Sequence, residues 1–426
     1  MVLNLFKEML FGRLARTSIV LFAGGIGAGI TGFAFQVVMG HMLPPSEYAV
    51  LSAILAFFMI IVSPFYTLLL VIARKVSEFR SSNDDGSITR FFFSVNIRSL
   101  VFGVVLSGGA LLFIDSLQGL LKVDNRVLIY LFWLVVLLSI FQVLNQAFLQ
   151  GLQKFNWLSF SGLLVQLLKT LFAILLVWLG YGVGGALWGT VLAVLITWLV
   201  TGAALYKSLI SGRGRAYQPA NLTFKQILPI FIANTAFLIL TQIDLVLVNY
   251  YFLPDEAGVY ASASVLGKVV LFLPAGIAQA LFPMVVERHS RGQGSASLMF
   301  QAVFLTGVSC GIGILIYYFF GNTIIAVLYG DAYLGAGEIL KYYGLAIFPM
   351  ALVYIAKHFL IAKGRVLFAY LFFPFAPLLL LCIHFFHQTL LQVVLWVGLS
   401  GAGLVLLGYG LLWRQYLLGA GKSVPV

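Results

Sequence analysis

Long apolar runs separated by short polar breaks are the feature that most constrains the fold of this 426-residue chain. Each run is about 20 residues long, which at ~1.5 Å rise per residue matches the ~30 Å hydrocarbon core of a bilayer. The backbone in lipid must satisfy its own hydrogen bonds, so each run predicts a helix. Only 9% of the residues are charged and 62% are hydrophobic, which leaves too little polar surface for a soluble domain. The chain is predicted to be an all-α polytopic membrane protein.

The pattern predicts about twelve transmembrane helices. They are expected at residues 17–40, 47–72, 91–114, 127–149, 157–179, 184–206, 226–252, 257–285, 297–320, 338–362, 366–386 and 390–413. The first sixteen residues carry Lys7, Arg13 and Arg16 around an apolar face, which indicates a short interfacial helix before the first span.

The distribution of basic residues predicts the orientation. If the N-terminus is cytoplasmic, the outside segments hold only Lys122, Arg126 and Lys341. The inside segments then hold eighteen of the 25 lysines and arginines: Lys7, Arg13, Arg16, Arg74, Lys75, Arg80, Arg90, Lys154, Lys207, Arg213, Arg215, Lys225, Arg288, Arg291, Lys363, Arg365, Arg414 and Lys422. By the positive-inside rule, both termini are expected in the cytoplasm, with the chain in the cytoplasmic (inner) membrane. The net charge of +12 is thereby explained by topology, and no nucleic-acid partner is expected.

The two halves of the chain are similar at a shift of about 210 residues. Residues 43–50 (LPPSEYAV) resemble residues 253–259 (LPDEAGV), and Pro64 falls on Pro274. Six spans map onto six, so the repeat is parallel, with an N-terminal lobe (1–206), a cytoplasmic linker (207–225) and a C-terminal lobe (226–426). Such repeats suggest a transporter whose lobes rock around a central site. The two prolines are interpreted as helix kinks that line a cavity, with a simple packing kink as the alternative.

Five ionisable residues lie inside the predicted spans, where a charge is costly unless it is paired, snorkels or faces water. Lys169 and Lys268 lie near the midplane, and we expect a water-filled cavity at Lys268. Arg98 and Lys357 lie within about two turns of the cytoplasmic side, where snorkelling is an alternative. Asp244 has three open roles: a structural partner for a lysine, a proton or cation site, or a polar contact for the substrate.

Four cations and one anion in the interior favour an anionic cargo group, such as a phosphate or pyrophosphate, over hydrophobic cations. No metal or cofactor is expected. His384 and His387 are spaced i, i+3 without a third ligand nearby, and Cys310 and Cys382 both lie in apolar runs.

Several segments, in their order and spacing, resemble a known family. They are residues 43–48 (LPPSEY), 148–155 (FLQGLQKF), 180–186 (GYGVGGA) and 253–260 (LPDEAGVY), together with Asp244. The chain resembles, over essentially its whole length, the polysaccharide-transport (oligosaccharide flippase) branch of the multidrug/oligosaccharidyl-lipid/polysaccharide exporter superfamily.

The resemblance implies two six-helix lobes around a cavity lined by spans 1, 2, 7 and 8. It implies that a polyprenyl-pyrophosphate-linked oligosaccharide is flipped to the outer leaflet by alternating access, for surface polysaccharide biosynthesis. Lys268, Arg98, Lys169 and Lys357 are then the candidate substrate contacts, although Lys169 is off the expected lining. Asp244 is the candidate coupling site for a proton or sodium ion. Expected partners are membrane lipids and a glycan polymerase or glycosyltransferases.

Two alternative functions remain at this point. One is a proton- or sodium-coupled multidrug exporter, although such exporters tend to place acidic residues in the N-terminal lobe, whose spans have none here away from their ends. The other is a membrane-embedded glycosyltransferase or polymerase. An enzyme of that kind needs a sizeable outer loop with paired carboxylates or arginines, and the longest outer segment, about residues 321–337, has Asp331 and no arginine.

Overall fold

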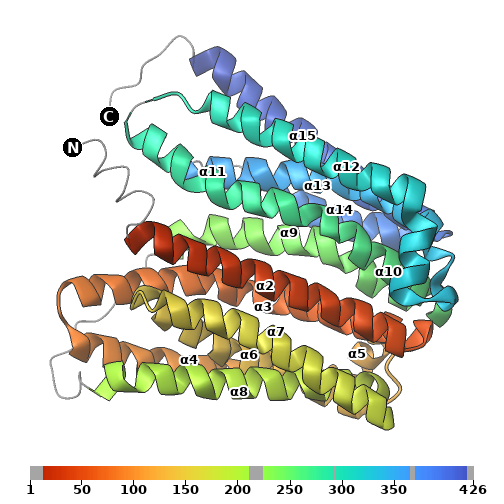
Figure 1. Ribbon diagram of the computed structural model, residues 1–426, viewed down its shortest axis with the longest axis horizontal. Helices are drawn as coiled ribbons and strands as arrows, with labels where there is room; N and C mark the ends of the chain where they lie inside the picture. The colour runs from red at the N-terminus through yellow and green to blue at the C-terminus, as the bar shows by residue number, and fades with distance from the viewer. Residues whose placement is uncertain (1–12, 211–223, 292, 365–369, 420–426) are drawn as a thin grey trace. The chain divides into compact units, whose positions relative to one another are not determined.

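The computed structural model describes residues 13–210, 224–291, 293–364 and 370–419, and in this part of the chain all regular secondary structure is helical. The long helices are α2 (Arg13–Met42), α3 (Pro45–Ser81), α4 (Asp85–Leu111), α6 (Arg126–Gly151), α7 (Phe155–Leu176), α8 (Gly182–Ile210), α9 (Phe224–Tyr251), α10 (Pro254–Gly267), α11 (Phe272–Ser290), α12 (Ala296–Tyr329), α13 (Ala336–Ala362), α14 (Phe372–Phe385) and α15 (Leu390–Gly419) (Figure 1). Short helical pieces are α5 (Ile114–Leu121), η1 (Val177–Tyr181), η2 (Lys268–Leu271) and η3 (Asp331–Tyr333).

The helices confirm a multi-pass membrane protein. Ten helical stretches among the described residues are long and apolar enough to cross a membrane, and one of them joins α7 to α8. Gly180 (φ 89°) and Gly182 (φ 48°) turn the chain between these two helices in a conformation that favours glycine. Together with the shorter apolar α14, this gives the twelve predicted spans. Large apolar side chains point outward, among them Phe300 (73% exposed) and Leu406 (74%), as lipid contact requires.

Some helices are longer than the apolar runs that predict them. The span predicted at 47–72 continues in α3 to Ser81. Its last turns are stabilised by ion pairs of Glu78 with Lys75 (2.9 Å) and Arg74 (3.3 Å), because residues three and four apart share a helix face. Part of the interfacial helix expected at 1–16 and part of the span expected at 366–386 lie outside the described residues.

Equivalent backbone features recur in the two halves. Pro45 and Pro254 each stand at the first position of a helix, where a missing N–H costs nothing. Gln153 (φ 54°) follows α6, and Gly364 (φ 69°) follows α13 at the equivalent position. Both helices are thus followed by a residue with left-handed backbone angles at the same position, which agrees with the predicted parallel repeat.

Contacts divide the chain into two compact units, one of Met1–Leu43 with Ile61–Phe224 and the other of Pro44–Ile60 with Lys225–Val426. The first residues of α3 therefore belong with the second unit. A Cβ on Gly258 would come within 2.0 Å of the Pro45 carbonyl oxygen, and the buried Tyr48 ring lies 5.6 Å from that of Tyr329. The lobe boundaries at 206 and 226 stay a prediction.

The core of the first unit contains a buried aromatic cluster. Phe148 on α6 is fully buried, and its ring centroid lies 5.8 Å from that of Phe91 and 5.0 Å from that of Phe92, both on α4. Such pairs add to the stability that burial alone provides.

Small residues allow the helices of this unit to approach closely. Gly24 on α2 lies against Ser159 on α7, where a Cβ would come within 1.7 Å of the Ser159 Oγ. Gly185 and Gly189 on α8 lie against the α7 backbone, and a Cβ on Gly189 would come within 2.6 Å of the Ala173 nitrogen. Without a hydrophobic driving force between helices in lipid, such contact is a main source of association.

We therefore expect Gly189→Ala to push α7 and α8 apart and to lower the free energy of unfolding by about 1–3 kcal/mol. Gly184→Ala is the matched control, because its Cβ would lie 3.5 Å from Leu128, an ordinary contact. Thermal unfolding of the detergent-purified variants, followed by intrinsic fluorescence, measures the difference. Equal Tm values for the two variants would contradict the packing.

Candidate functional site

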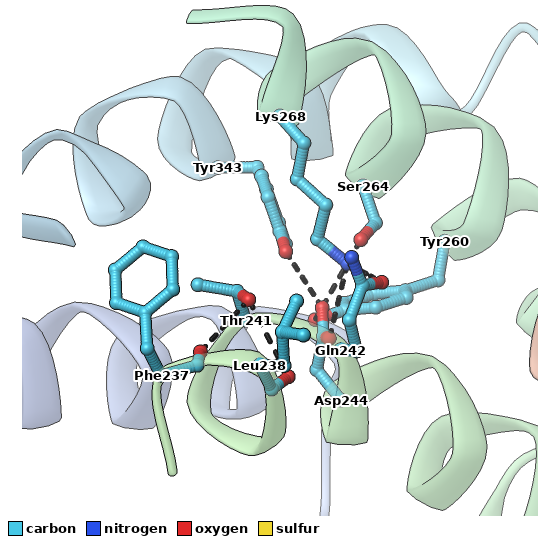
Figure 2. A network of polar contacts seen from close by, with 9 residues as sticks. All are labelled: Phe237, Leu238, Thr241, Gln242, Asp244, Tyr260, Ser264, Lys268 and Tyr343. Atoms are coloured by element: carbon cyan, nitrogen blue, oxygen red, sulfur yellow. Dashed lines mark hydrogen bonds and ion pairs between the residues drawn. The ribbon is translucent and has the colours of Figure 1, made fainter. Parts of the chain in front are cut away.

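Asp244 is a fully buried carboxylate on α9 and the centre of a network of polar side chains. An ionised carboxylate removed from water is strongly destabilising unless its charge is paired and its oxygens accept hydrogen bonds. Both conditions are met within the second unit, by side chains from α10, η2 and α13 (Figure 2).

Three hydroxyl groups converge on one oxygen of this carboxylate. Tyr343 donates to Oδ2 at 2.7 Å, and Tyr260 and Ser264 each donate to the same atom at 3.0 Å. All three residues are buried, so water does not compete for these bonds. Hydrogen bonds to a charged acceptor are about twice as strong as neutral ones, so these three bonds hold the carboxylate firmly in place.

The other carboxylate oxygen faces a lysine. Lys268 Nζ lies 3.3 Å from Asp244 Oδ1 and 3.4 Å from Gln242 Oε1, so the ammonium stands between two acceptors on the same helix (Figure 2). The Lys268 side chain is 12% exposed and that of Asp244 is inaccessible. The ion pair neutralises the buried charge, while the lysine keeps some access to its surroundings.

Helical spacing brings these donors together. Tyr260, Ser264 and Lys268 follow one another at intervals of four and therefore share one face of α10 and its continuation. Gly267 makes room for the ring that carries the Tyr343 hydroxyl, because a Cβ there would come within 2.4 Å of this ring.

The helix that carries the site changes geometry at Lys268. It tightens into the 3₁₀ turn η2 before Pro274, whose ring nitrogen has no hydrogen to donate to the Val270 carbonyl. Val270 accepts from Cys310 Sγ instead (3.6 Å), and the Leu266 carbonyl accepts from the Tyr317 hydroxyl (2.7 Å). Side chains of α12 thus hydrogen-bond two carbonyls next to the irregular backbone, where lipid offers no other partner.

Lys357 on α13 lies in a different environment. It is 4% exposed, and its Nζ donates to Asn234 Oδ1 at 3.0 Å. The ammonium also lies over the rings of Phe237 (4.7 Å) and Tyr354 (4.8 Å). Snorkelling therefore does not explain this lysine, and no carboxylate forms an ion pair with it in the described part of the chain.

The two candidate site residues of the first unit, Lys169 and Arg98, lie in different environments. Lys169 on α7 lies over the buried ring of Phe35 on α2, 4.0 Å from its centroid. Although Lys169 was expected to lie off the cavity lining, its ammonium thus packs against the first predicted span. Arg98 on α4 is exposed. The helix α3 continues through Pro64 without interruption, whereas Pro274 follows the 3₁₀ turn η2.

The structure brings Asp244 and Lys268 together, which is the lysine partnership that the sequence left open. Sequence reasoning missed the hydroxyls of Tyr260 and Ser264, although their spacing from Lys268 on one face was a usable signal. Tyr343 lies 99 residues from Asp244 in the sequence, and no local pattern there indicates its contact with the carboxylate. No group of three or more metal-ligating side chains occurs in the described ranges. His384 and His387 both contact Tyr251 instead.

A family model described as polysaccharide biosynthesis protein matches residues 14–289. The chain belongs to this family. The match spans α2 to α11 and so includes Asp244, Tyr260, Ser264 and Lys268. It confirms the resemblance seen in the sequence.

Solved membrane transporters share the fold of this member of the polysaccharide biosynthesis family. An inward-facing multidrug resistance MATE family transporter of the MOP superfamily is 15% identical, with a TM-score of 0.78 over 92% of this chain and 96% of its own. Lipid II flippase MurJ, in an inward closed conformation, is 14% identical, with a TM-score of 0.71 over 96% and 88%. MATE in complex with MaL6 is 15% identical, with a TM-score of 0.66 over 95% of each chain. These identities establish the two-lobed fold alone. No curated protein sequence matches the chain.

Tyr343→Phe is expected to remove one of the three hydroxyl donors to Asp244 and to lower the free energy of unfolding by about 1.5–3 kcal/mol, the range for hydrogen bonds to charged groups. The matched control is Tyr342→Phe, since the neighbouring Tyr342 is 53% exposed. Thermal unfolding in detergent compares the two. A Tyr343→Phe protein as stable as the control would show that Asp244 does not depend on this bond.

Proposed function

We propose that the protein flips a polyprenyl-pyrophosphate-linked oligosaccharide across the cytoplasmic membrane by alternating access, for surface polysaccharide biosynthesis. The observation that carries the proposal is membership of the polysaccharide biosynthesis family in a chain made of membrane-spanning helices. A protein of this composition acts on a cargo at or within the bilayer, and the sugar precursors of surface polysaccharides are carried there on lipid pyrophosphates.

The electrostatics of the buried cations support an anionic cargo group. Lys169 and Lys357 lie against aromatic rings, and no carboxylate pairs with either of them in the described part of the chain. With Lys268 and the exposed Arg98, they are the groups we assign to the pyrophosphate or to acidic sugars. Guanidinium and ammonium groups are the usual partners of phosphate oxygens in proteins.

Lys268 differs from the other three because it already has an anionic partner. A pyrophosphate that recruits Lys268 competes with Asp244 for the same ammonium, so substrate binding and the state of Asp244 are linked. This is why we assign Asp244 to coupling with a proton or sodium ion: a buried carboxylate that loses its lysine must take up another cation.

The same pairing argues against the alternative functions. A multidrug exporter that moves hydrophobic cations needs an accessible anionic site, whereas Asp244 is buried and neutralised by Lys268. A glycosyltransferase or polymerase needs paired catalytic groups, and the buried carboxylate here is held by structural hydroxyl donors. We therefore propose a transporter rather than an enzyme, supplied by glycosyltransferases and followed by a glycan polymerase, with both termini in the cytoplasm.

Lys268→Ala is expected to reduce flipping of the lipid-linked glycan by at least about tenfold, since losing a charged contact costs more than ~1.4 kcal/mol. Translocation is measured in vesicles as protection of the glycan from an external enzyme. The Lys268→Ala/Asp244→Asn double variant controls for the unpaired carboxylate and should be equally inactive but more stable than the single variant. Wild-type flipping by the double variant would remove Lys268 from the substrate site.

Asp244→Asn is expected to make flipping independent of an imposed proton or sodium gradient, because an amide exchanges neither ion. The rate is compared with and without each gradient in the same vesicles. Asp115→Asn is the control, because Asp115 lies in the short helix α5, pairs with Arg126 and is exposed. Gradient dependence that survives in Asp244→Asn would reject the coupling role.

A further inference from the structure

The ammonium of Lys268 lies between two oxygen atoms of the kind that bind monovalent cations. Its Nζ lies nearly equidistant from two oxygens, Asp244 Oδ1 at 3.3 Å and Gln242 Oε1 at 3.4 Å. One is a carboxylate and the other an amide carbonyl, which are the oxygen types that hard cations prefer. The ring of Tyr343 lies 5.9 Å from the same nitrogen and completes an environment that favours positive charge.

The site is built independently of the lysine. The three hydroxyls of Tyr260, Ser264 and Tyr343 all bond to Oδ2, whereas Lys268 bonds to Oδ1. Removing the lysine therefore leaves the carboxylate oriented by its hydroxyl donors, with Oδ1 directed to the position that the ammonium has left (Figure 2). Oriented oxygens on rigid helices are what distinguishes a binding site from a chance cluster of polar groups.

Lys268 itself is the adaptable part of the network. It follows the last residue of α10 and begins the 3₁₀ turn η2, and its long flexible stem ends in a partly exposed ammonium. Both hydrogen bonds of the ammonium are long for a charge-assisted contact, which is typically about 2.7–2.9 Å. The ammonium is thus loosely held, whereas the carboxylate is tightly held by Tyr343 at 2.7 Å.

We propose that Lys268 is the resident cation of this site: its ammonium takes the place of a monovalent metal ion between Gln242 and Asp244, and the two exclude each other. While Lys268 is in place, the protein binds no alkali cation there. An alkali cation enters only after the lysine has left, which orders the two events. The proposal rests on the cation role that we propose for Asp244 and deepens it by assigning the occupant of the Gln242–Asp244 position. Because cation binding is measured without the cargo, its failure is distinguishable from a failure of flipping.

The test is the thermal stability of purified protein in sodium, potassium or choline chloride at equal ionic strength. We expect the wild-type Tm to be the same in all three salts. Lys268→Ala should have a lower Tm in choline, because it leaves a buried charge unpaired. Sodium or potassium should raise it by about 3 °C or more, since a ligand that binds only the folded state stabilises it. Choline is too large to enter.

Two further variants make each outcome decisive. Lys268→Ala/Asp244→Asn should show no response to sodium or potassium, because the anionic ligand is gone. Lys268→Ser serves if the alanine variant yields no folded protein, since its small side chain also leaves the position open. The proposal is overturned if neither single variant responds to the cations, or if the double variant responds equally. A wild-type response that Asp244→Asn abolishes would overturn it as well, by showing that metal binds with Lys268 present.

Discussion

The neutralisation of one buried carboxylate is the constraint around which the second unit is organised. Asp244 has no access to solvent, so its charge must be matched inside the protein. The matching groups come from α10 (Ser264), its continuation η2 (Lys268) and α13 (Tyr343). Since each of these bonds joins α9 to another helix, the network is also a packing contact. A change at any member alters both the charge balance and the helix arrangement.

The number and type of helices could be read from the sequence because lipid leaves so few options. Each span must satisfy its own backbone, so an apolar run of the right length becomes a helix. Local rules also sufficed where the chain turns, as at Pro45 and Pro254. The boundaries were harder. Hydropathy does not register the ion pairs of Glu78 that extend α3, and it does not register how the 3₁₀ turn at Lys268 divides one predicted span into α10 and α11.

The candidate site was predictable only in its charges. A lysine and an aspartate inside apolar runs are conspicuous, because each is costly there. Their hydroxyl partners are not, since tyrosine and serine are ordinary residues of membrane helices. Tyr343 donates to Asp244 only because Gly267 lets its ring approach α10. This approach depends on tertiary packing and leaves no local pattern in the sequence. Sequence therefore names the groups that need a partner, and packing decides which partners they receive.

The buried lysines are held in two physically different ways, and the difference bears on function. A carboxylate cancels the charge of Lys268, whereas aromatic faces attract Lys169 and Lys357 without cancelling theirs. A cation–π contact makes a buried ammonium tolerable and leaves its field available to a ligand. In the proposed mechanism, the lysines on aromatic rings attract the anionic cargo directly, while Lys268 exchanges one anionic partner for another. Only the exchange at Lys268 changes the surroundings of Asp244, so we propose it as the step that links cargo binding to cation uptake.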